Sequence, residues 1–80
     1  MTKSLIELKR LENWVWEDCF DSVHGLTMHG SDALHDIESV RRAILQLELP
    51  AQKELLQGWK NYHPNYSYEY ELKEIIHNLL

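Results

Sequence analysis

The side chains with the widest chemical range lie close together in the sequence. They are the only cysteine, Cys19, and three of the five histidines, His24, His29 and His35. Thiolate and imidazole are ligands that zinc prefers, but their spacing here matches no structural zinc pattern such as paired Cys-x2-Cys or His-x3-His units. A nucleophilic cysteine needs an accessible thiol, whereas Cys19 falls on the apolar side of an expected helix. We therefore predict no catalytic residue, no metal and no cofactor, and keep a metal-binding domain built on these four residues as an alternative.

Acidic side chains dominate the same part of the chain. Residues 11–40 hold seven Asp and Glu and no Lys or Arg, whereas the rest of the chain holds six acids and eight Lys and Arg. The formal net charge of −5 opposes binding to nucleic acid phosphates, so we expect no direct nucleic acid ligand. A clustered negative field instead attracts a basic protein surface and speeds its association. The alternative is a solvated surface that only keeps a small domain in solution.

Trp14 lies inside this acidic stretch. On a helical wheel it falls about 150° from the centre of the apolar arc, among the acids Glu7, Glu17, Asp18 and Asp21. Tryptophan is enriched among binding hot spots because it buries a large area at little entropic cost. We expect Trp14 to be exposed at the centre of a binding surface. The alternative is that Trp14 packs against the fourth helix or under the chain terminus.

These observations predict a protein-binding module whose partner is a basic protein. Its partner-binding surface comprises one tryptophan and six acids, namely Trp14, Glu17, Asp18, Asp21, Asp32, Asp36 and Glu38. Small acidic proteins that inhibit nucleases, as antitoxin or immunity proteins do, satisfy the same physics by covering a surface meant for phosphate. The alternative outside this class is a helical subunit of a homo-oligomer such as a homodimer.

A first helix is expected to carry the beginning of the acidic stretch. Ser4 and Glu7 match a capping box at its start, and Gly25 suits its end. Its apolar residues step by three or four, which predicts a core face of Leu5, Leu8, Leu11, Val15, Cys19 and Val23. Gly25 and Gly30 are expected to bracket a short loop. Ser31 or Asp32 is then expected to cap the second helix.

Three further helices follow from the same periodicity. The second is expected to bury Leu34, Ile37, Val40, Ile44 and Leu47. Pro50 suits the first turn of a short third helix, which is expected to bury Ala51, Leu55, Trp59 and Tyr62. His63 and Pro64 interrupt the chain, and a last helix presents Tyr68, Leu72, Ile75, Ile76 and Leu79 to the core.

The fold class predicted from these elements is all-α, a small antiparallel bundle of about four helices with a short third helix. Eighty residues suit a single helical domain over residues 1–80. The chain has no apolar run long enough for a secretory signal or for a membrane span. One cysteine allows no internal disulfide, so we expect a cytoplasmic protein without a membrane partner.

Overall fold

The computed structural model describes residues 2–46 and 49–79, and these form a small all-α bundle. Its helices are α1 (Thr2–Cys19), α2 (Met28–Leu45), α3 (Pro50–Asn61) and α4 (Ser67–Leu79). The only strands in the described ranges are β1 (Phe20–Asp21) and β2 (Gly25–Leu26), which form a minimal antiparallel hairpin. The predicted fold class is confirmed, and α3 is the shortest helix.

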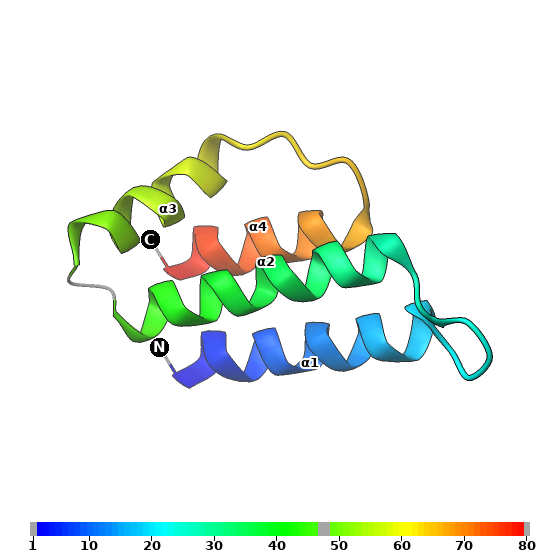
Figure 1. The fold of residues 1–80 in the computed structure, drawn as a ribbon. Helices are drawn as coiled ribbons and strands as arrows, with labels where there is room; N and C mark the ends of the chain where they lie inside the picture. Colours follow the sequence, from blue (N-terminus) through cyan, green and yellow to red (C-terminus); the bar gives the residue numbers. More distant parts are fainter. Residues whose placement is uncertain (1, 47–48, 80) are drawn as a thin grey trace.

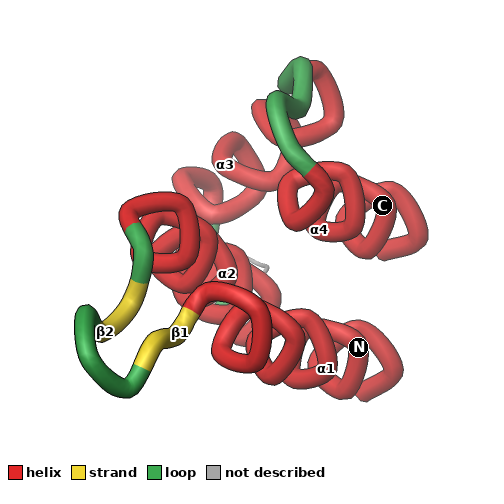
Figure 2. Tube along the Cα trace, turned by 90° about the vertical axis from the view of Figure 1, so that its right-hand side faces the viewer, coloured by secondary structure: helices red, strands yellow, loops and turns green. Residues whose placement is uncertain are grey.

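The helices form three layers. Helices α2 and α4 lie in the middle, with α1 on one side of them and α3 on the other (Figures 1 and 2). Successive helices run in opposite directions, so α1 is antiparallel to both of its main neighbours, α2 and α4 (Figure 1). Because α1 contacts two helices, its buried arc is wider than that of a helix with one neighbour.

The core lies where α1, α2 and α4 meet, and α3 adds one side chain to it. Its residues are Leu8, Leu11, Val15, Cys19, Ala33, Ile37, Val40, Ala43, Ile44, Leu56, Leu72, Ile75 and Ile76. On each of the three long helices these residues recur every three or four positions, as burial of one helical stripe requires. Most of the predicted core face is confirmed for α1, α2 and α4. Leu47 lies outside the described residues.

The first helix ends earlier than predicted. It stops at Cys19, and the following residues pair as a hairpin in which Phe20 faces Leu26 and Asp21 faces Gly25. Gly25 has a positive φ of 79°, a conformation that glycine adopts without steric cost. Val23, predicted to be in the core, is therefore in the hairpin turn and 81% exposed.

The second helix begins before its predicted start. Thr27 is its N-cap, and the Thr27 hydroxyl accepts a hydrogen bond from the Gly30 amide. Gly30 is thus a buried helical residue rather than the end of a loop. A Cβ at this position would lie 2.5 Å from Cys19 Cβ, so glycine permits α1 and α2 to approach closely at this corner.

Pro50 occupies the predicted position at the start of α3, but the buried face of that helix was predicted wrongly. Leu56 is its only buried residue, whereas Ala51 and Leu55 are exposed and Trp59 is half-buried. Tyr62 follows the helix as its C-cap. A short helix that lies across two others contacts them over a small area, so its wheel alone does not define one buried stripe.

The start of α4 contains a buried acid that the periodicity did not predict. Glu69 is 6% exposed, and its carboxylate accepts hydrogen bonds from the Asn65 amide at 2.8 Å and from the Tyr62 hydroxyl at 3.1 Å. These bonds anchor the segment that leads from α3 into α4.

None of the helices in the described ranges is both long and apolar enough to cross a membrane.

Candidate functional site

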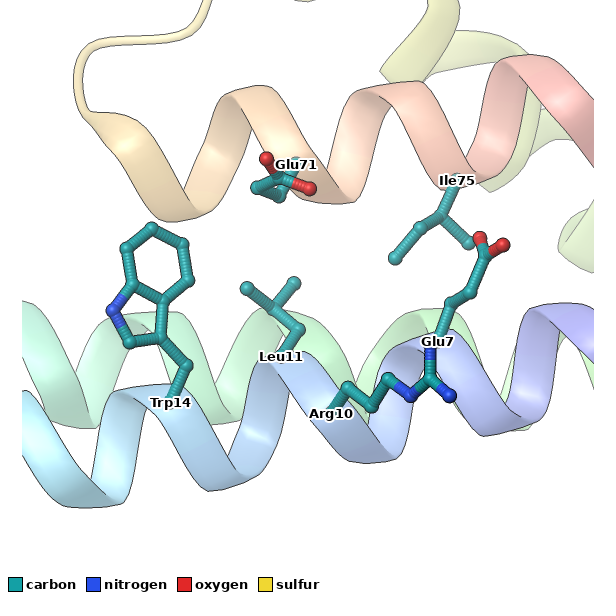
Figure 3. A pocket seen from close by; sticks show the side chains of 6 residues that line it. All are labelled: Glu7, Arg10, Leu11, Trp14, Glu71 and Ile75. Atoms are coloured by element: carbon teal, nitrogen blue, oxygen red, sulfur yellow. The ribbon is translucent and has the colours of Figure 1, made fainter.

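An open groove of about 370 Å³ runs between α1 and α4. It is lined by Glu7, Arg10, Leu11 and Trp14 from α1 and by Glu71 and Ile75 from α4 (Figure 3). Leu11 and Ile75 belong to the core, so the groove has an apolar floor and charged rims.

Helical spacing positions the residues of this groove. Glu7, Leu11 and Trp14 are separated by four and three residues, so they share the stripe of α1 that faces α4. Asp18 continues the same stripe four residues later. Glu71 and Ile75, also four apart, face this stripe from α4 (Figure 3). The groove is therefore a product of two aligned helix edges.

The expectation that Trp14 is fully exposed is wrong. Trp14 is half-buried, packs against the core and meets Tyr68 edge to face, with ring centroids 4.6 Å apart. The alternative that Trp14 packs against the fourth helix is confirmed. Its ring still forms one end of the groove, because the residue also lines that space (Figure 3).

Tyr68 connects Trp14 to the end of α1. Its hydroxyl is hydrogen-bonded to the Cys19 thiol at 3.2 Å. This contact with sulfur, together with burial and the nearby Asp18 carboxylate, raises the pKa of Tyr68 to about 12. Trp14 and Asp18, both predicted binding residues, thus both lie near Tyr68.

The two carboxylates of the groove, those of Glu7 and Glu71, make no side-chain hydrogen bond or ion pair among the described residues. No ion pair joins Glu7 or Glu71 to another side chain in the described part of the molecule, and Arg10 is equally unpaired there. Glu7 reaches from α1 toward α4, whereas Arg10 lies along α1 (Figure 3). Two acids and one base give the groove a net negative charge.

The opposite edge of α1 differs, because its acid, Glu12, is paired with Arg41 of α2 and with Lys9 of α1. Arg41 donates to Glu12 and to Glu38, each at 2.6 Å, and Arg42 makes a longer contact with Glu38 at 3.4 Å. Hydrogen bonds from Lys9 and from Arg41 lower the pKa of Glu12. Glu38, predicted to bind a partner, is therefore already paired.

Asp21 and Glu17 lie at the hairpin end of α1. Asp21 accepts a hydrogen bond from the Val23 amide at 2.8 Å and contacts His24 at 3.1 Å. The Val23 amide and then the His24 side chain lower the pKa of Asp21. Asp21 thus stabilises the hairpin turn, whereas Glu17 and Asp18 are exposed on α1.

Asp32 and Asp36 lie in a different place, at the start of α2. They line a hollow of about 390 Å³ with His29, His35, Asn65, Tyr66 and Glu69. Burial, and then the Glu69 carboxylate, raise the pKa of Asp36. Burial, and then the carboxylates of Glu69, Asp36 and Asp32, raise the pKa of Tyr66 to about 12. The predicted acidic residues therefore lie in three separate environments rather than on one continuous surface.

The metal-binding alternative is not supported by the arrangement of its residues. Cys19 is buried beside Tyr68, His24 is exposed in the hairpin, and the His29 ring packs 5.4 Å from that of Tyr66. Within residues 2–46 and 49–79, no three His, Cys, Asp or Glu side chains lie close enough to hold a metal ion. Cys19, His24, His29 and His35 thus form no common site.

Of the two acids that line the groove, Glu7 was placed beside Trp14 by the helical wheel but left out of the predicted binding set, and Glu71 was missed. Both lie outside residues 11–40, so a search for the longest acidic stretch did not include them. The signal that could have found them is spacing, because each is four residues from a core residue, Leu11 or Ile75.

Comparisons with protein family models, curated proteins and solved structures found no match to this chain.

Proposed function

We propose that this chain is a small acidic module that binds a basic protein through the α1 edge facing α4 and the adjoining hairpin end. The supporting observation is the groove that Trp14 bounds at one end and that also holds two carboxylates, Glu71 and Glu7, without ion pairs among the described residues (Figure 3). Aromatic area beside uncompensated negative charge suits a basic surface, because the charges steer association and the ring supplies buried area. No chemistry is required of the module.

The narrower form of the proposal is inhibition of a nuclease or another nucleic-acid-binding protein, as an antitoxin or immunity protein does. Such a partner exposes a basic surface where phosphates bind, and an acidic module that covers it blocks access. Within the predicted set, Trp14, Glu17 and Asp18 are best placed for this role. Asp21, Asp32 and Asp36 would add long-range attraction, and Glu38 contributes least because it is paired.

The test is affinity purification from native cell extract at low and moderate salt, with bound proteins identified by mass. The informative variant carries Asp18→Lys and Glu17→Lys. Its matched control carries Glu54→Lys and Glu74→Lys, which change the net charge equally at exposed sites on α3 and α4. We expect one basic protein to bind the wild type and the control and to be lost from the informative variant. Equal recovery with both variants would show that this surface is not the binding site.

Self-association is a second candidate function because two aromatic residues lie exposed at the hairpin end. Trp16 is 46% and Phe20 is 51% exposed, and their rings pack 5.7 Å apart. An exposed aromatic pair of this kind is typical of a contact surface. Light scattering across a range of concentrations tests the idea, and a monomer at every concentration would exclude it.

A further inference from the structure

We infer that the groove between α1 and α4 receives one arginine side chain of the basic partner. This inference rests on the proposed function and names the chemical group that the groove recognises. Three properties of the groove support it: its size, its aromatic wall and its free carboxylates.

The size and lining of the groove suit one long side chain. Its volume of about 370 Å³ is near the lower end for ligand sites, which run from roughly 300 to 1,000 Å³. Leu11 and Ile75 provide an apolar floor for the methylene stem of an arginine. Trp14 lies at one end, where a planar guanidinium can stack on the indole (Figure 3).

The charges of the groove favour arginine over a neutral occupant. Glu7 and Glu71 come from opposite helices, and neither forms an ion pair within the described residues (Figure 3). A guanidinium has five donors arranged as a planar fork and can satisfy a carboxylate with two parallel hydrogen bonds, whereas an ammonium is a compact point charge. The groove therefore favours arginine over lysine as well.

Arg10 restricts the groove to a single cation. With Arg10 on the rim, the two carboxylates leave one unit of negative charge to be matched. One guanidinium completes this balance, and a second would be opposed by Arg10. The groove is thus suited to one anchoring residue rather than to a run of basic residues.

The other acidic surfaces are less suitable for an incoming arginine. Glu12 and Glu38 already bind Arg41, which occupies the position of such a ligand from within the chain. In the hollow at the start of α2, the Glu69 carboxylate is engaged by Tyr62 and Asn65. At the α1 and α4 edges, by contrast, Glu7 and Glu71 form no ion pair among the described residues and share a groove with the indole ring of Trp14.

The direct test uses the tripeptide Gly-Arg-Gly with blocked ends, and its lysine and citrulline counterparts, as probes of the full chain. The indole N–H signals of Trp14, Trp16 and Trp59 are followed by NMR during each titration. We expect a saturable shift at Trp14 with the arginine peptide, several-fold weaker binding of the lysine peptide and no shift with citrulline. No saturable shift at Trp14, or an equal shift with citrulline, would overturn the inference.

Paired variants separate this site from general acidity. Glu7→Gln with Glu71→Gln removes both carboxylates of the groove, and Glu54→Gln with Glu74→Gln removes two exposed acids elsewhere. We expect at least a tenfold loss of affinity for the arginine peptide and for the basic partner in the first variant, and less than a twofold loss in the second. Equal losses in both would overturn the inference.

The same variants distinguish failure of the arginine site from failure of the proposed function. A basic partner that binds the Glu7→Gln, Glu71→Gln variant as tightly as wild type overturns the arginine site and leaves the proposed function standing. Recovery of no basic protein overturns the proposed function, whatever the peptide titrations give.

Discussion

The two edges of α1 use the same residue type in different ways. On the edge facing α2, Glu12 is bound by Arg41, which also binds Glu38. On the edge facing α4, Glu7 of α1 and Glu71 of α4 form no ion pair within residues 2–46 and 49–79, although Arg10 lines the same groove. A basic side chain therefore pairs with the carboxylates where they join α1 to α2, whereas the carboxylates of the groove stay unpaired beside Arg10. This difference distinguishes an acid that contributes to folding from one available to a partner.

The largest effect is expected at Trp14, which belongs to both the core and the groove. Replacing a fully buried tryptophan by alanine lowers the free energy of unfolding by about 3 to 5 kcal/mol. Trp14 is half-buried, so we expect its replacement to lower the free energy of unfolding by about 2 kcal/mol. Urea denaturation of Trp14→Ala measures this loss, and binding of the basic partner should be lost as well. Trp16→Ala is the control, since Trp16 is more exposed, and a loss there as large as at Trp14 would contradict the assignment.

The next effect is expected at the ion pairs between α1 and α2. Arg41→Ala removes the cation shared by Glu12 and Glu38 and leaves Glu12 with Lys9 alone and Glu38 with the longer Arg42 contact. We expect it to lower the free energy of unfolding by about 1 to 2 kcal/mol, between the values for exposed and buried pairs. The matched control is Arg42→Ala, because the Arg42 side chain is 74% exposed and makes only the 3.4 Å contact. Denaturation at low and high salt measures both, and equal losses would show that Arg41 has no special role.

A smaller effect on stability is expected at Asp36, and its pH dependence is opposite to that of Glu12. Its folded-state pKa is raised, so its contribution to stability is present below its unfolded pKa of about 3.8 and is lost as pH rises through the folded value. Glu12, with a lowered pKa, contributes stability above its unfolded value, and this is lost as pH falls. Asp36→Asn should therefore stabilise the protein at neutral pH, by less than Arg41→Ala destabilises it.

Thermal denaturation from pH 3 to pH 7 measures the Asp36 effect. Asp32→Asn is the control because Asp32 is exposed in the same hollow. A neutral-pH destabilisation by Asp36→Asn would mean that the charged form of this side chain is favoured in the fold, contrary to the stated direction.

The smallest effect on folding is expected in the groove itself. Glu7→Gln with Glu71→Gln should change the free energy of unfolding by less than about 0.5 kcal/mol, since neither carboxylate forms an ion pair with another described residue. Denaturation of this variant beside wild type is the measurement. A loss comparable to that of Arg41→Ala would mean that both edges of α1 serve the fold and would remove the contrast between them.

The helices could be predicted from the sequence because a helix that buries one face needs an apolar residue every three or four positions. Prediction was weakest where tertiary contacts decide the local structure. The close approach of Gly30 to Cys19 could not be inferred from local sequence, in which a glycine equally suits a loop. The exposure of Trp14 was misjudged because a wheel centred on one apolar arc does not include a second neighbouring helix.

The candidate site was only partly predictable for a related reason. The helical wheel placed Asp18 beside Trp14, but charge density along the sequence also selected Glu38, which pairs with Arg41 and Arg42 three and four residues later on the same helix. That local pairing follows from helical spacing, whereas the pairing of Glu12 with Arg41 joins two helices and could not be inferred from local sequence. Glu71 was missed because it faces α1 from a helix about sixty residues away in the chain (Figure 3).

The hydrogen bond between Cys19 and Tyr68 makes the only thiol of the chain a reporter of motion. Cys19 is buried, so a maleimide can reach its sulfur only when α1 and α4 separate transiently at that end. The rate of alkylation then measures how often this opening occurs. Because Tyr68 also packs against Trp14, a ligand in the groove should slow the labelling, which gives a timed chemical assay for occupancy that needs no label on the ligand.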